Sequence, residues 1–260
     1  MIIGIVGYGV VGEAIGINLK KLDILINIYD KYKNIGSFKD ILDSDFTFIC
    51  LPTPFKNNHL DYSSIEEVCK MLAHKRYVGH ILIKSTLNPD TIDILSSKYP
   101  SLNLVHNPEF LSAKTACIDF KNQKQIILGP SKTCKDISLI KNFYKRYFIN
   151  ANIIVVSCKE SAMIKLGANC FYATKIQFFN EIYRACELIN IDFDLVKNCI
   201  IGNGWVNPMH TNVPGPDGKL SYGGGCFPKD MNGLNNYLKK IGCPNGVIGA
   251  AIEEQKIMRK

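Results

Sequence analysis

Residues 2–12 read IIGIVGYGVVG, a short apolar run that leads into three glycines spaced G-x-G-x-x-G. The apolar run is typical of a buried β-strand, and the pattern of a helix follows it. In such a unit Gly7 permits a tight turn, Gly9 lets a pyrophosphate approach the backbone, and Gly12 allows close packing of the helix on the strand. We therefore predict that a dinucleotide binds at this helix N-terminus. The predicted contacts are Gly7, Tyr8, Gly9, Val10, Val11 and Gly12.

An acidic residue, Asp30, closes the next apolar run, Ile24–Tyr29. It follows the glycines at roughly the 20-residue distance expected of this motif. A carboxylate there accepts hydrogen bonds from ribose hydroxyls and repels a 2′-phosphate, which favours NAD over NADP. A glycine turn without a ligand is the alternative, and the flanking strand, helix and acid argue against it.

Apolar runs of strand length alternate with helical patterns, which is typical of a parallel sheet covered on both faces. We predict an α/β fold, with a Rossmann-type, mostly parallel sheet over residues 1–156 and a smaller all-helical domain over residues 157–260. Between the second and third strands there is room only for a turn near Phe38–Leu42. The predicted strands are Ile2–Val6, Ile24–Tyr29, Phe46–Leu51, His80–Ile83, Asn103–Val105, Gln125–Leu128 and Asn152–Val156.

The pattern becomes helical after Val156. Ser157 and Glu160 have the spacing of a capping box, so a long helix is expected to begin there and to end near Asn190. A helix over about 194–201, a loop rich in glycine and proline over 203–225, and a helical segment from Lys229 that is interrupted near 242–246 are expected to follow.

The composition excludes several classes of protein. At 47% apolar and 21% charged residues the chain is a globular protein, and no dense Lys/Arg run predicts a nucleic-acid partner. The net charge of +8 can gather an anionic substrate, although an ordinary basic surface explains it better. None of the ten cysteines is paired as C-x-x-C and no spaced ligand set predicts a metal, so reduced thiols and a cytoplasmic location are expected. The apolar start lacks a basic leader, so neither a signal peptide nor a membrane span is expected.

Polar residues follow successive predicted strands. Thr53 comes after the third strand, Ser85 and Thr86 after the fourth, and Asn107 and Glu109 after the fifth. Ligands of open α/β sheets bind at the carboxyl ends of the strands, so we expect these side chains to face one crevice. Thr53, between two prolines, is equally well explained as a turn residue.

A second candidate site surrounds Cys226, in the segment Tyr222–Asp230. Three glycines precede the cysteine and Pro228 fits a helix start, so Cys226 is expected near a positive helix end with Lys229 nearby. Such surroundings lower a thiol pKa and make the thiolate a nucleophile. The alternative, a tight turn with an inert cysteine, is our interpretation of the other cysteines.

Lys165 and Asn169 are four residues apart on the long predicted helix and therefore share one face. A cation and an amide aimed at one point can stabilise an oxyanion. Taken alone, the pair is better explained as a solvated helix face.

Together these segments resemble the UDP-glucose/GDP-mannose dehydrogenase family, in the order in which the family carries them and from Met1 to about Asp230. The matching segments are 7–12, 51–54 (LPTP), 84–86 (KST), 107–111 (NPEFL), 165–169 (KLGAN) and 224–230 (GGCFPKD).

The resemblance implies a four-electron oxidation of UDP-glucose to UDP-glucuronate with two NAD, through a thiohemiacetal and a thioester on Cys226. It also implies that Lys165 and Asn169 stabilise the oxyanion, while Glu109 acts as the base with Thr86 and Asp230 holding water. Further cofactor contacts are expected from Asp30, Thr53, Thr86 and Lys229. Substrate contacts are expected from Glu109, Phe110, Leu111, Lys165, Asn169, Tyr222, Gly223 and Lys219.

The sequence departs from the family pattern in several places. Ala113 and Lys114 stand where a second carboxylate and a glycine are usual, and an arginine expected near Val206 is absent. Family members continue into a further domain that grips the uridine diphosphate, roughly where this sequence stops. We expect the loop 212–219 to make part of these contacts with the uridine diphosphate, through Lys219.

The expected protein is thus an NAD-dependent nucleotide-sugar dehydrogenase, and a homodimer because the long helix has more apolar surface than the chain can cover. Two alternatives remain. The first is a dehydrogenase of GDP-mannose or a UDP-HexNAc, and the second is a non-catalytic protein that binds NAD or a nucleotide sugar.

Overall fold

The computed structural model describes residues 1–259. The chain divides into two compact units. The first comprises Met1–Pro54 and Asp61–Lys165, and the second comprises Phe55–Leu60 and Leu166–Lys260. Each unit has a hydrophobic core of its own, and each is described separately below.

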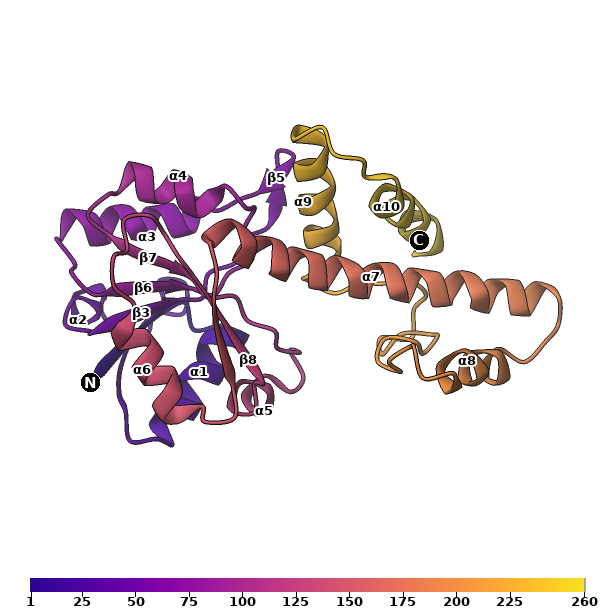
Figure 1. Ribbon diagram of the computed structural model, residues 1–260, viewed down its shortest axis with the longest axis horizontal. Helices are drawn as coiled ribbons and strands as arrows, with labels where there is room; N and C mark the ends of the chain where they lie inside the picture. The colour runs from indigo at the N-terminus through magenta and orange to yellow at the C-terminus, as the bar shows by residue number, and fades with distance from the viewer. Residues whose placement is uncertain (260) are drawn as a thin grey trace. The chain divides into compact units, whose positions relative to one another are not determined.

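A seven-stranded sheet forms the centre of the first unit, with strand order β2-β1-β3-β6-β7-β8-β9. Strands β3, β6, β7 and β8 are labelled in Figure 1, together with the helices around them. All neighbouring strands are parallel except β7 and β8. The order reverses beside β1, which is where open α/β sheets form a ligand-binding crevice. The strands are β1 Ile2–Val6, β2 Leu25–Tyr29, β3 Phe46–Ile49, β6 His80–Ile83, β7 Asn103–His106, β8 Gln125–Pro130 and β9 Asn152–Val155.

Helices cover both faces of this sheet, which explains why its strands are apolar on both sides. One face packs against α1 (Val10–Lys20), α5 (Ala116–Lys121) and α6 (Ser138–Tyr147). The other face packs against α2 (Phe38–Ile41), α3 (Ser63–His74) and α4 (Thr91–Lys98). The predicted fold class is confirmed, including the shortened connection between β2 and β3, where only the single turn α2 occurs.

The second unit is built on the long helix α7 (Cys158–Leu188), whose first residues belong to the first unit. The expected capping box is present, since Glu160 accepts from the Ser157 N–H at 2.7 Å and its own N–H donates to Ser157 Oγ at 3.2 Å. Asn190 ends the helical region with a φ of +55°. The remaining helices are α8 Phe193–Gly202, α9 Phe227–Lys240 and α10 Gly246–Met258.

A small hairpin, which we did not expect from the sequence, also belongs to the second unit. Strands β4 (Phe55–Lys56) and β5 (His59–Leu60) pair antiparallel around Asn57 and Asn58, both with positive φ. Asparagine tolerates this conformation, which two-residue hairpin turns require. Leu60 is buried against Gly233 of α9, so the second unit is helical apart from this hairpin.

Candidate active site

The glycine turn between β1 and α1 has the geometry that its sequence predicts. Gly7 has a φ of +89°, and a Cβ there would lie 2.6 Å from the Cys50 carbonyl oxygen. A Cβ at Gly12 would collide with the Gly7 carbonyl, whereas nothing lies within 4 Å of a Cβ at Gly9. The turn is therefore closed where the helix meets the strand and open where a pyrophosphate would sit.

Backbone donors hold the Asp30 carboxylate. Tyr8 N–H donates to Oδ2 at 2.7 Å, while the N–H groups of Tyr32 and Lys33 donate to Oδ1 at 3.0 and 2.9 Å. Burial alone would raise the pKa of Asp30, but these backbone hydrogen bonds and the charge of Lys33 outweigh it and lower the pKa. A carboxylate has about four acceptor positions, so one remains for a ribose hydroxyl.

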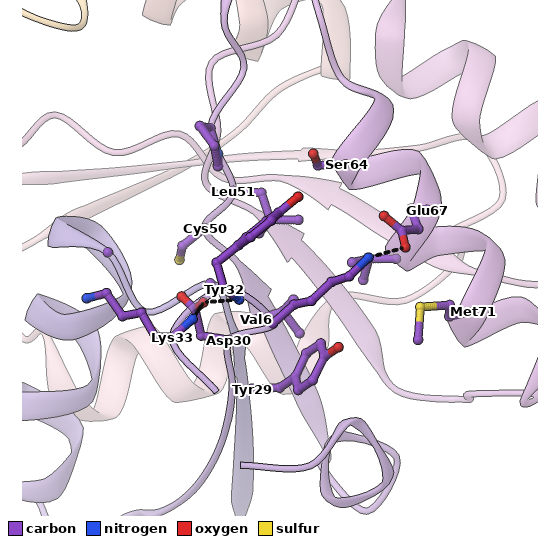
Figure 2. Close-up of a pocket in the computed structure, with 15 residues that line it drawn as sticks. Val6, Tyr29, Asp30, Tyr32, Lys33, Cys50, Leu51, Ser64, Glu67 and Met71 are labelled. Atoms are coloured by element: carbon purple, nitrogen blue, oxygen red, sulfur yellow. Dashed lines mark hydrogen bonds and ion pairs between the residues drawn. The ribbon is translucent and has the colours of Figure 1, made fainter. Parts of the chain in front are cut away.

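Asp30 lies at the edge of a pocket of about 220 Å³, shown in Figure 2. Its lining is mostly apolar and comes from the ends of β1, β2 and β3 and from α3. An ion pair between Lys31 and Glu67, at 3.1 Å, lies within this lining. An apolar pocket beside a carboxylate with one acceptor position left suits an adenine ring and its ribose. The side chains that α3 contributes are Ser64, Glu67, Val68 and Met71, none of which the sequence motif indicated.

The polar residues after β3 and β6 bind each other's loops. Thr53 Oγ1 donates to the Thr86 carbonyl at 2.8 Å, and Ser85 Oγ donates to the Leu51 carbonyl at 2.6 Å. Thr53 and Thr86 are both buried. These bonds join the two loops at the carboxyl edge of the sheet, as expected for residues that shape one crevice.

Glu109, after β7, forms a partly buried ion pair. Its Oε1 lies 3.2 Å from Lys165 Nζ, and its Oε2 accepts from the Leu111 N–H at 2.5 Å. The Lys165 ammonium also lies 5.2 Å from the centre of the Phe110 ring. The pair thus joins a carboxylate that can take a proton to a cation that can stabilise negative charge.

The second unit contains another polar cluster, centred on Asp230 of α9. Its side chain is fully buried, and it accepts from Asn169 Nδ2 at 2.6 Å and pairs with Lys229 at 2.5 Å. Cys226 is exposed and occupies the N-cap position of α9, with Pro228 in the first turn. The sequence interpretation is correct that this cysteine stands at the N-terminus of a helix, the end with the positive partial charge.

Most of the other cysteines are in surroundings that suppress reactivity. Burial raises the pKa of Cys50, Cys69 and Cys170 to about 12. It raises the pKa of Cys134 and Cys158 to about 11. These thiols stay protonated at neutral pH, in agreement with their interpretation as inert core residues. Cys199 and Cys243 are exposed, so the interpretation as buried residues is wrong for these two.

The other expected substrate contacts lie in different surroundings. Tyr222 is buried in the core of the second unit and donates to the Ala251 carbonyl at 3.3 Å, so its hydroxyl already has an acceptor. Gly223 lies against the guanidinium of Arg259. Lys219 is exposed, and its backbone N–H donates to Asp217, which pairs with Arg259.

Ala113 and Lys114, which depart from the family pattern, are both exposed. They line a groove of about 280 Å³ together with Val10 and Glu13 of α1. Within residues 1–259, no group of three or more His, Cys, Asp or Glu side chains is arranged to hold a metal ion. In the same range, no helix combines the length and hydropathy that a membrane span needs.

Comparison with known proteins identifies the family. A model of the UDP-glucose/GDP-mannose dehydrogenase family, NAD binding domain, matches residues 29–148, and a model of the family's central domain matches residues 159–256. The chain belongs to this family, so the resemblance seen in the sequence is confirmed, and NAD is the cofactor of the first unit.

Individual relatives agree with this assignment. The chain is 31% identical over 226 residues to a UDP-glucose 6-dehydrogenase of Rickettsia bellii. The matched region covers 84% of this chain and 50% of that protein. Among solved structures, a UDP-glucose dehydrogenase of Pyrobaculum islandicum has a TM-score of 0.86 at 20% identity, covering 98% of this chain and 68% of that one. A UDP-D-ManNAc dehydrogenase of Pyrococcus horikoshii has a TM-score of 0.79 at 18% identity, covering 99% and 69%. The chain thus spans about half the length of the curated relative.

Proposed function

We propose that this chain carries out the NAD-dependent oxidation of UDP-glucose to UDP-glucuronate, as a UDP-glucose 6-dehydrogenase. The observation that carries the proposal is the cluster around Asp230, in which a buried carboxylate orders Asn169 and Lys229 close in sequence to a cysteine at a helix N-terminus. Buried carboxylates with charged and amide partners are concentrated at catalytic sites, which favours an enzyme over a binding protein.

In this proposal the first unit holds the cofactor. The open backbone at Gly9 and the N-terminus of α1 receive the pyrophosphate, and Asp30 receives the ribose hydroxyls of the adenosine half. When bound there, NAD would supply the hydride acceptor for the two oxidations at the sugar C6, one cofactor molecule for each. Thr53 and Thr86 shape the crevice beside it through their mutual hydrogen bond.

Cys226 supplies the covalent step. Its thiolate attacks the C6 aldehyde, so a C–S bond forms and the carbonyl electrons move to oxygen. The Asn169 amide and the Lys165 ammonium stabilise that oxyanion. After the second oxidation, Glu109 takes a proton from water, which attacks the thioester carbon. The C–S bond then breaks, the uronate leaves and the Cys226 thiolate is restored.

The test is NADH absorbance with a panel of nucleotide sugars, using the wild type beside Cys226→Ser. We expect about two NADH per UDP-glucose, and essentially no turnover in the variant, because a serine hydroxyl is not ionised near neutral pH. Turnover by Cys226→Ser at the wild-type rate would exclude the covalent route.

Two other functions compete with this one. Oxidation of another nucleotide sugar is favoured by the similarity to the UDP-D-ManNAc dehydrogenase, and the same panel detects it as NADH formed with GDP-mannose or a UDP-HexNAc. A non-catalytic binding protein is favoured by Ala113 in place of the usual carboxylate. Such a protein would form no NADH with any nucleotide sugar of the panel.

The loop 212–219 is proposed to contact the nucleotide. Gly215 N–H donates to the Lys219 carbonyl at 2.8 Å, which closes the loop, while the Lys219 side chain is exposed and available to a phosphate. Lys219→Ala should raise the KM for UDP-glucose and leave that for NAD unchanged. An unchanged KM for UDP-glucose would remove Lys219 from the substrate site.

The proposed assembly is a homodimer in the cytoplasm. On α7, Phe171 is 64% exposed and Phe178 is 51% exposed, seven residues apart on one face. Such an apolar stripe is covered most simply by a second copy of the chain. Within residues 1–259 no cysteine is joined to another by a disulfide, which suits a reducing compartment. Light scattering should give twice the chain mass, and a Phe171→Asp variant should give the monomer.

A further inference from the structure

Lys84, at the end of β6, is a buried cation that the proposed mechanism does not use. The residue is only 3% exposed, and its ammonium donates to Asn107 Oδ1 at 3.1 Å. No carboxylate within residues 1–259 lies at ion-pair distance from it. Burying an unpaired ammonium is costly, so a fold that retains one is expected to use its charge.

The acceptor, Asn107, is held from several directions. Its Oδ1 also accepts from the Tyr144 hydroxyl at 2.5 Å, and its Nδ2 donates to the Ile127 carbonyl of β8 at 2.8 Å. Its backbone N–H donates to the Ile83 carbonyl of β6 at 2.9 Å. Asn107 therefore fixes the start of the segment that carries Glu109 two residues later.

Titratable groups of several elements act on or surround Lys84. Burial is the largest cause that lowers its pKa, to about 8, and Lys165 of α7 lowers it further, while Cys50 after β3 and Glu109 after β7 oppose this. His106 of β7 and Tyr144 of α6 complete the surroundings, and burial keeps both uncharged at neutral pH. Lys84 and Lys165 are thus two cations within electrostatic reach of one carboxylate.

We propose that Lys84 is a positioning residue that acts through Asn107 and Glu109. Its hydrogen bond fixes Asn107, and its charge attracts the Glu109 carboxylate, so that Glu109 stays oriented toward Lys165. The consequence for catalysis rests on the proposed function, in which Glu109 is the base. The electrostatic coupling of Lys84, Glu109 and Lys165 does not depend on the proposed function.

The coupling is tested without turnover, by NMR titration of the protein with ¹³C-labelled lysine, with the Lys84 signal assigned by its loss in Lys84→Met. We expect a midpoint near pH 8 in the wild type. Glu109→Gln should lower the midpoint and Lys165→Met should raise it, each by about half a unit or more, because one removes an attracting charge and the other a repelling one. A midpoint that neither variant moves would overturn the proposal.

The positioning role is tested in the active protein with Lys84→Met and a matched control, Tyr144→Phe. Both remove a donor to Asn107 Oδ1, but only the first removes a charge. Lys84→Met should lower kcat about tenfold and keep the KM for NAD. It should also remove the decline of kcat that we expect in the wild type above about pH 8, where Lys84 loses its proton. Tyr144→Phe should keep the wild-type pH profile.

Equal losses of kcat in the two variants, each with the wild-type pH profile, would make Lys84 a structural residue only and would overturn the proposal. Thermal melting establishes that both variants are folded. A wild type that oxidises no nucleotide sugar would reject the proposed function, and the NMR titration would still decide whether Lys84, Glu109 and Lys165 are coupled.

Discussion

Two aspartates, one in each unit, show how differently the same carboxylate is used. Asp30 is held by the backbone N–H groups of Tyr8, Tyr32 and Lys33, and it remains partly exposed beside the pocket. Asp230 is fully buried and is held by the side chains of Asn169 and Lys229.

The two sites differ in whether substitution of a neighbouring side chain can remove the donors that hold the aspartate. Backbone donors are supplied by the turn itself, so the Asp30 site depends on the fold and on few neighbouring side chains. Side-chain donors and an ion pair make the Asp230 site depend on particular residues, in a place where water does not weaken their charges. The first arrangement suits a binding site and the second suits catalysis.

The most severe disruption should come from Asp230→Asn. This change keeps the shape of the side chain but removes the charge that orders Lys229, and we expect kcat to fall on the order of 1000-fold. Steady-state kinetics should show a nearly unchanged KM for NAD. If kcat were unchanged while the KM for NAD rose, Asp230 would have the cofactor-binding role that we propose for Asp30.

Acid should distinguish the two units through His106. This side chain is fully buried, with Nε2 donating to the Ser85 carbonyl at 3.2 Å and Nδ1 accepting from the Ser161 hydroxyl at 2.8 Å. Burial lowers its pKa to about 4, against an ordinary value of 6.5. The unfolded chain therefore binds a proton between pH 6.5 and 4 that the folded chain does not, and stability falls through this window by about 3 kcal/mol.

Hydrogen exchange measured between pH 7 and pH 4 is the appropriate experiment, because it follows each unit separately. The first unit should lose protection before the second, and His106→Gln should reduce the pH dependence. Equal loss of protection in both units would show that His106 does not control acid stability.

Asp30→Ala should have a smaller effect and a different one. The loss of a charged acceptor for the ribose hydroxyls should raise the KM for NAD about 30-fold and leave kcat almost unchanged. NADP kinetics provide a second measurement, since the variant should discriminate less against a 2′-phosphate. An unchanged KM for NAD would contradict the proposed role of Asp30 in cofactor binding.

The smallest effects come from neighbours of the two aspartates, and they test the comparison directly. Lys229→Met removes a side-chain partner of Asp230 and should lower kcat about tenfold. Tyr32→Ala leaves the backbone N–H that binds Asp30, and the KM for NAD should change less than about threefold. If both variants lost the same factor in kcat/KM, the two aspartates would not differ in their dependence on neighbouring side chains.

Much of the first unit could be predicted from sequence, because local patterns determine it. Each predicted strand occurs within one or two residues of its expected position, and Ser157 and Glu160 form their predicted reciprocal cap. The roles of Gly7 and Gly12 follow from sterics alone, and the structure agrees with them.

The rest depends on contacts between residues distant in sequence. The α3 side chains reach the pocket only because α3 packs on one face of the sheet, and no local spacing encodes that. The burial of Lys84 likewise depends on Asn107 and Tyr144, which follow it by 23 and 60 residues. By contrast, the Asn57-Asn58 turn did have a local signal, two adjacent residues that tolerate positive φ, and the hairpin could have been predicted from it.

That hairpin has a consequence for how the chain can be divided. Residues 55–60 lie within the sequence of the first unit but belong to the second, where Leu60 fills the space above Gly233 and Asn236 donates to the Asn58 carbonyl. A fragment that begins at Leu166 would leave that apolar surface uncovered. Expression of the halves as separate polypeptides should therefore yield an insoluble carboxyl-terminal piece, and proteolytic nicking near Asn57 should loosen a region more than a hundred residues away in the chain.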